Sequence, residues 1–148
     1  MTHGFRFTAE KVAARLELLR AQVVRRRHPI APFRLLELPD AATEPPLDAS
    51  TEGWERIEPD GYWGRFDLNF LLRSSFALPE GWDPKASALH FPLGNAGDIF
   101  THPEALLYLD GEPIASADRY HHTIPIPARF ADGAEHQIAL HGWTGMSG

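Results

Sequence analysis

The chain has 148 residues, of which 43% are hydrophobic and 23% are charged, a composition typical of one soluble globular domain. It contains no cysteine, which excludes disulfides and thiolate metal sites within these residues. No apolar run approaches the roughly 20 residues that a membrane span needs, and the first residues lack the basic-then-apolar pattern of a secretion signal. We therefore expect a cytoplasmic protein without a membrane partner.

The net charge of −6 is unevenly distributed along the chain. Residues 1–27 hold seven Lys/Arg and two Glu, whereas the remainder holds seven Lys/Arg and eighteen Asp/Glu. An acidic body repels phosphates, and the basic arm has no interleaved aromatic residues for base stacking. We therefore expect no nucleic-acid partner, and a basic arm that docks on the acidic body or on a neighbouring copy.

Residues 1–28 are expected to form an N-terminal amphipathic helix, spanning residues 8–27 and ended by Pro29. Its apolar residues fall at helical spacing on one narrow stripe: Val12, Leu16, Leu19 and Val23. Thr8 is placed to cap the first turn, with Phe7 and Val12 packing across it, and residues 25–27 put three arginines in the last turn. A stripe this narrow has to be covered, so we expect the helix to mediate homo-oligomer contacts or contacts with another domain.

Residues 29–53 are rich in proline. Prolines at this density, with Asp and Ala between them, favour an extended segment that lies on a surface. We predict a connector of low order between the helix and the next domain.

Residues 54–148 are expected to form the main domain, because the pattern changes to the period-two alternation of β-strands. Phe66, Leu68, Phe70 and Leu72 alternate with Asp67, Asn69, Leu71 and Arg73. We predict strands at residues 66–78, 86–93, 105–109, 112–115, 122–126 and 135–141. Several short strands with turn signals between them indicate an all-β fold, a β-sandwich or jelly roll.

Two local signals refine this prediction. Asp110-Gly111 predicts a tight hairpin between two of the strands. Pro125 and Pro127 cannot donate to a β-ladder, so the strand that contains them is expected at a sheet edge.

The most polar loop, residues 94–104, supplies the candidate site. Asp98, His102 and Glu104 lie close together in sequence, and Asp118 is expected from across the hairpin. They are candidates for a carbohydrate or domain-interface surface, or for a hydrogen-bonded loop that fixes its own shape. His136 and His141 are five residues apart, so they face opposite sides of a strand and cannot clasp one ion. We assign no metal and no cofactor to this chain.

Other catalytic chemistry finds little support in the sequence. The chain has no Gly-x-Ser-x-Gly elbow and no phosphate-binding loop. Asp98 and Glu104 stay open as a pair of glycosidase carboxylates. An exposed tryptophan would suit stacking on a sugar ring, although aromatic residues in sheets more often pack inward.

Five segments, taken in order, resemble the N-terminal domain of class II α-mannosidases, the cytosolic and vacuolar branch of glycoside hydrolase family 38. They are Trp63–Trp82 (WGRFDLNFLLRSSFALPEGW), Leu89–Gly94 (LHFPLG), His102–Pro113 (HPEALLYLDGEP), Ala117–His121 (ADRYH) and Leu140–Gly145 (LHGWTG). The resemblance covers roughly residues 54–145, and the helix and connector suit the N-terminal extension of that family.

The resemblance implies a galactose-binding-like β-sandwich that precedes a catalytic α/β barrel. In such enzymes a zinc ion and an aspartate nucleophile, both in the barrel, carry out retaining cleavage of α-mannosides. The zinc-binding signature of the barrel is not found in these residues, so we expect a non-catalytic domain whose partner is the catalytic domain of the same polypeptide. The alternative is a free-standing carbohydrate-binding module or lectin-like domain.

Overall fold

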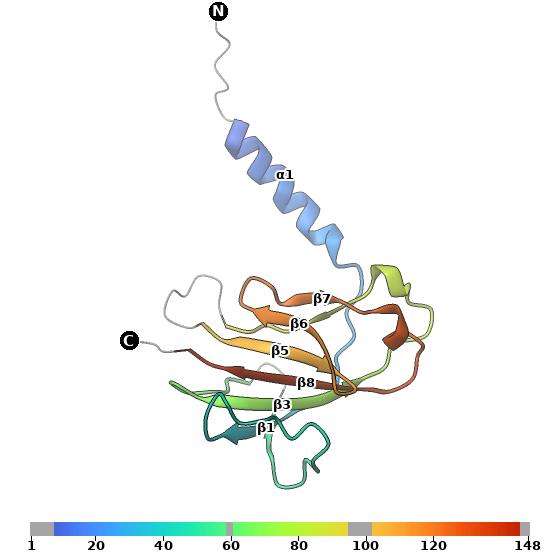
Figure 1. The fold of residues 1–148 in the computed structure, drawn as a ribbon. Coiled ribbons are helices and arrows are strands. Elements are labelled where there is room, and N and C mark those ends of the chain that lie inside the picture. The colour runs from blue at the N-terminus through green and yellow to red at the C-terminus, as the bar shows by residue number, and fades with distance from the viewer. Residues whose placement is uncertain (1–7, 59–60, 95–101, 146–148) are drawn as a thin grey trace, which may run out of the picture.

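The computed structural model describes residues 8–58, 61–94 and 102–145, which Figure 1 shows as a ribbon. They form one α-helix, α1 (Thr8–Val23), eight β-strands and two short 3-10 helices. The strands are β1 (Phe33–Leu38), β2 (Glu55–Ile57), β3 (Asn69–Phe76), β4 (Ala88–His90), β5 (Glu104–Leu109), β6 (Glu112–Asp118), β7 (Thr123–Pro125) and β8 (His136–Trp143), with η1 (Pro84–Ala86) before β4 and η2 (Ala128–Phe130) before β8.

The strands form two antiparallel sheets. The larger sheet has the order β2-β1-β3-β8-β5-β6, and β4 pairs with β7 in a two-stranded sheet. Figure 1 shows β7 above the larger sheet, on the side from which α1 departs. Apolar side chains from both sheets share one core. The described residues therefore form an all-β sandwich with one N-terminal helix, as the sequence predicts.

The core lies between the two sheets. Phe70, Leu107 and Ile138 of the larger sheet are completely buried, and Leu89 and Ile124 reach the same cluster from the smaller sheet. Because successive side chains of a strand point to opposite faces, every second residue of β3, β5 and β8 faces away from this core. The larger sheet therefore has an outer face whose side chains do not pack in the core between the sheets.

Both local predictions for the strands are confirmed. Leu109 pairs directly with Glu112, and Asp110 and Gly111 between them have φ angles of 48° and 81°, the left-handed conformation that a two-residue hairpin turn requires. β7 ends at Pro125 and pairs with β4 alone among the described strands, so it is an edge strand.

The connector prediction is wrong for six of its residues. Phe33–Leu38 form β1, which pairs with both β2 and β3 in the larger sheet. Pro32 and Pro39 lie just outside this strand, so proline bounds it without interrupting its hydrogen bonds. This segment is ordered because Leu35 and Leu38 are buried. Their side chains pack into two different hydrophobic clusters, one on each face of the sheet.

The two longest predicted strands are both shorter in the structure. The strand expected at residues 66–78 is β3, which begins at Asn69 and ends at Phe76. Asp67 has a φ angle of 54°, which breaks the extended backbone just before it. The strand expected at residues 86–93 is reduced to β4, Ala88–His90.

The helix is also shorter than predicted. It ends at Val23, so the three arginines at residues 25–27 lie outside its last turn. Tertiary contacts account for the early end: the Arg26 guanidinium lies 5.0 Å from the ring centroid of Trp82 and donates to the carbonyl oxygen of Gly81 at 3.2 Å. In the described part of the chain no helix has both the length and the apolar character needed to cross a bilayer.

The close approach of β5 and β8 depends on Gly142, which yields a first prediction. A Cβ atom at this position would overlap the carbonyl oxygen of Glu104 and lie 2.8 Å from the Ala105 Cβ. We expect Gly142→Ala to lower the free energy of unfolding by about 2–3 kcal/mol, measured by urea denaturation.

Gly53→Ala is the matched control. Its new Cβ would meet no atom within 4 Å, and its cost comes only from a φ angle of 79°, about 1 kcal/mol. Equal losses in the two variants would show that packing between β5 and β8 is not the constraint.

Candidate functional site

Two of the four candidate residues named from the sequence lie side by side on the larger sheet. Glu104, at the start of β5, pairs across the hairpin with Asp118, at the end of β6. On its other side Glu104 pairs with Trp143 of β8. His102 is exposed, two residues before β5, and Asp98 lies outside the described residues.

Glu104 and Asp118 border an open hollow on the outer face of the sheet, with a volume of about 450 Å³. They alternate along their strands with the buried residues Ala105 and Ala117, which face the core. The other outward side chains that line the hollow come from all four strands at this end of the sheet: Asn69, Leu106, Ser116, His141 and Trp143. The hollow is therefore built on paired strands, which hold its side chains in fixed relative positions.

Asp118 shapes the loop that follows β6. Its carboxylate accepts hydrogen bonds from the backbone N–H groups of Tyr120 at 2.6 Å and His121 at 2.7 Å, and its Oδ2 lies 2.9 Å from the His121 Nδ1. The hydrogen bond from the His121 side chain, together with those from the two backbone groups, lowers the pKa of Asp118 to about 2. Asp118 is therefore ionised at neutral pH, which excludes it as a general acid.

Glu104 and His141 are two titratable groups of the hollow that are available to a ligand. Neither side chain makes a hydrogen bond or ion pair with another described residue. Burial lowers the pKa of His141, so its imidazole is uncharged at neutral pH and can both donate and accept a hydrogen bond. No local pattern marks His141 as part of a site, because its partners in the hollow come from distant strands.

Trp143 adds a fixed aromatic ring to the hollow. Its indole Nε1 donates to the Asp67 Oδ1 at 2.7 Å, which holds the side chain in one orientation. A half-buried indole beside hydrogen-bonding groups offers an apolar surface and polar partners together.

The lining of the hollow selects among ligand classes. It contains two carboxylates and no Lys or Arg, so it repels anions. The neutral imidazole of His141, the amide of Asn69 and the hydroxyl of Ser116 both donate and accept hydrogen bonds. Together with a fixed indole, these groups suit a neutral ligand that carries many hydroxyl groups.

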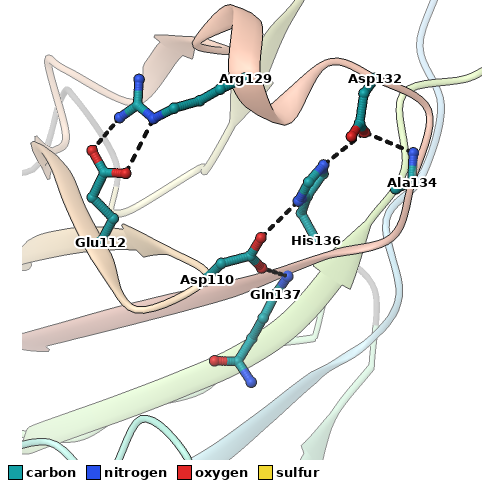
Figure 2. A network of polar contacts seen from close by, with 7 residues as sticks. All are labelled: Asp110, Glu112, Arg129, Asp132, Ala134, His136 and Gln137. Carbon is teal, nitrogen blue, oxygen red and sulfur yellow. Dashed lines mark hydrogen bonds and ion pairs between the residues drawn. The ribbon is translucent and has the colours of Figure 1, made fainter.

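A second polar cluster joins two turns at the other end of the sheet (Figure 2). His136, at the start of β8, is only 8% exposed. Its Nδ1 lies 2.7 Å from the Asp110 Oδ2, and its Nε2 lies 2.9 Å from the Asp132 Oδ1. The rings of Phe76 and Phe130 lie 5.8 and 5.3 Å from the imidazole centroid.

These contacts fix the protonation of the cluster. A neutral imidazole has one N–H and can donate to only one carboxylate. His136 therefore donates to both Asp110 and Asp132 only as the imidazolium, which has two N–H groups. The hydrogen bond with Asp110 is the main cause of a raised pKa of His136, with burial opposing it and Asp132 adding to it. Burial acts to raise the pKa of Asp110, but hydrogen bonds from His136 and the Gln137 N–H together lower it. For Asp132, the backbone N–H of Ala134 and then His136 lower the pKa.

The sequence interpretation missed this cluster. From the sequence, Asp110-Gly111 indicates only a hairpin turn, and His136 enters only as a candidate metal ligand. The signal that was present is an Asp at the first position of both turns, with a His four residues after the second Asp. Only the fold shows that the two turns lie at the same end of the sheet.

The cluster predicts how stability changes with pH. Because the pKa of His136 is raised, its contribution is complete below its ordinary value of 6.5 and is lost as pH rises through the folded value. Because the pKa values of Asp110 and Asp132 are lowered, their contribution is present above the ordinary value of 3.8 and is lost as pH falls through the folded values. We expect His136→Gln to lower the free energy of unfolding by about 1–2 kcal/mol between these limits, and by progressively less above pH 6.5.

Urea unfolding of both proteins at several pH values measures this difference. His102→Gln is the control, because His102 is exposed and has no partner among the described residues; its effect should be close to zero at every pH. A difference for His136→Gln that does not change between pH 5 and 9 would contradict the imidazolium assignment.

Comparison with protein-family models, curated proteins and solved structures found no match for this chain. Within the described ranges no group of three or more His, Cys, Asp or Glu residues could hold a metal ion. The arguments for function therefore come from the residues and their geometry.

Proposed function

We propose that this chain is the non-catalytic β-sandwich domain of an α-mannosidase, which supports a catalytic domain in the same polypeptide. The family resemblance supplies the enzyme class, and in this proposal the sandwich has the galactose-binding-like topology. The zinc ion and the aspartate nucleophile belong to the catalytic domain. No catalytic step is assigned to a residue of this chain.

The observation that carries the proposal is the hollow on the outer face of the sheet. An α-mannoside is neutral and rich in hydroxyl groups, the class of ligand that Glu104, His141 and Asn69 suit. Four of the segments that carry the resemblance supply the lining: Trp63–Trp82 through Asn69, His102–Pro113 through Glu104, Ala117–His121 through Asp118, and Leu140–Gly145 through His141 and Trp143. In this proposal, residues from the segments that resemble the family therefore lie together in one hollow that suits a sugar.

A free-standing carbohydrate-binding module is the second candidate. The same hollow supports it, because sugar binding through a fixed indole and polar side chains needs no catalytic domain. The two candidates differ in whether this sequence occurs in the same polypeptide as a hydrolase.

Sugar binding by the hollow is directly testable. We expect methyl α-mannoside to shift the NMR signals of the Trp143 indole N–H and of the Glu104 and His141 amides, with a Kd of about 1–10 mM. Glu104→Gln and His141→Ala should each weaken binding at least about fivefold, because the first replaces a charged acceptor with a weaker neutral amide and the second removes a hydrogen-bonding group.

Glu52→Gln is the matched control, since Glu52 is an exposed carboxylate outside the hollow. Its titration should equal that of the wild type. Unchanged spectra at about 50 mM sugar would show that the hollow does not bind this sugar. That result would not decide whether the chain belongs to an α-mannosidase, which the next experiment tests.

The enzyme assignment has its own test. An antibody against the sandwich should deplete α-mannosidase activity from an extract of the source cells, and a zinc chelator should abolish the depleted activity. Activity that stays in the supernatant while the sandwich is removed would favour the free-standing module.

The isolated chain should not hydrolyse an aryl α-mannoside, with or without added zinc. Turnover that disappears in Asp98→Asn or Glu104→Gln would instead establish a catalytic carboxylate in this chain and overturn the non-catalytic assignment.

A further inference from the structure

The stripe of α1 has the spacing of a coiled-coil seam. Val12, Leu16, Leu19 and Val23 are separated by four, three and four residues, the alternation of the two core positions in a heptad. All four side chains are more than half exposed, from 51% at Val12 to 78% at Val23. An α-helix of 16 residues is marginal in water when nothing covers its apolar side.

The helix does not bury this stripe against its own sandwich. Figure 1 shows α1 projecting away from both sheets, joined to the sandwich only beyond its C-terminal end. Arg26, three residues after the helix, holds that junction through its contacts with Gly81 and Trp82. The cover for the stripe must therefore come from another surface.

The charges beside the stripe select the orientation of a helical partner. At about 100° per residue, Arg15 and Arg20 flank the stripe on its two sides, whereas Glu10 and Glu17 lie on the back of the helix. In a parallel pair of identical helices, Arg15 would face Arg20 of the second copy, and the two cations would repel each other. In an antiparallel pair, Arg15 faces Gln22 of the second copy and Arg20 faces Ala13, so the repulsion disappears.

The sandwiches favour the same orientation. Residues 28–148 carry seven Lys/Arg and eighteen Asp/Glu, so two copies repel each other at short range. Each sandwich is attached at the C-terminal end of its helix. An antiparallel pair places the two acidic bodies at opposite ends of a rod about 24 Å long, whereas a parallel pair places them side by side.

We propose that α1 pairs with α1 of a second copy of this chain, antiparallel, with Val12 opposite Val23 and Leu16 opposite Leu19. The contact is isologous, so the pair closes as a symmetric dimer and does not extend into a filament. This dimer does not depend on the function proposed for the hollow.

Sedimentation equilibrium of the full chain tests the pairing. We expect a concentration-dependent dimer, and Leu16→Glu should raise its dissociation constant at least about tenfold, because it places a charge in the seam. Leu18→Glu is the matched control: Leu18 is 70% exposed and lies on the back of the same helix, so this variant should dimerise like the wild type.

Two outcomes overturn the dimer. One is a wild-type chain that stays monomeric up to about 1 mM, which would leave the stripe for a different partner. The other is equal weakening by Leu16→Glu and Leu18→Glu, which would show that dimerisation does not use the stripe. Circular dichroism of each variant checks that α1 keeps its helical content.

Oxidative cross-linking tests the orientation, and the absence of native cysteine makes the result unambiguous. A mixture of Val12→Cys and Val23→Cys chains should form mainly mixed disulfide dimers. Val12→Cys alone should cross-link poorly, because its two thiols are separated by about 16 Å in the antiparallel pair. Efficient cross-linking of Val12→Cys with itself would indicate a parallel pair and overturn the proposal.

Discussion

The pairing of β8 on both of its edges is the constraint on which the rest of the structure depends. β3 pairs along one edge of β8 and β5 along the other, which fixes the register of three strands distant in sequence. In that register Ile138 and Leu140 join the core, while His141 and Trp143 reach the hollow. A slip of one residue would exchange the two faces and place polar groups in the core, so burial of the core also positions the hollow.

The same chemical groups serve different purposes in different surroundings. The carboxylates of Asp110, Asp118 and Asp132 all accept backbone hydrogen bonds and hold turns. Glu104 has no such partner among the described residues and faces the hollow. His136 lies between two carboxylates that favour its charged form, whereas burial favours the neutral form of His141. Side-chain type alone therefore does not distinguish a structural group from a ligand-binding group.

The two proposed interaction surfaces are chemically distinct and lie in different parts of the molecule. The hollow is acidic, hydroxyl-compatible and built on paired strands. The seam of α1 is apolar, flanked by Arg15 and Arg20, and carried on a helix that leaves the sandwich on the side of β7. A dimer formed through α1 accordingly leaves both hollows open, so sugar binding and self-association are compatible in one assembly.

The sequence by itself determined the features that depend on local chemistry. Period-two alternation identified the core strands, Asp110-Gly111 identified the hairpin, and Pro125 identified the edge strand, because each reflects a backbone preference that acts over a few residues. The same locality explains why Glu104 and Asp118 could be placed opposite each other: the hairpin connects them.

The tertiary structure alone decided the features that depend on distant partners. β1 is ordered because β2 and β3 pair with it, a gain that the flanking prolines do not reveal. The helix ends early, with Arg26 packed on Trp82, 56 residues further along the chain. His141 joins the hollow and His136 joins Asp110 only once β8 lies beside β5, because hydrogen bonds and burial depend on proximity in space, which the local sequence does not specify.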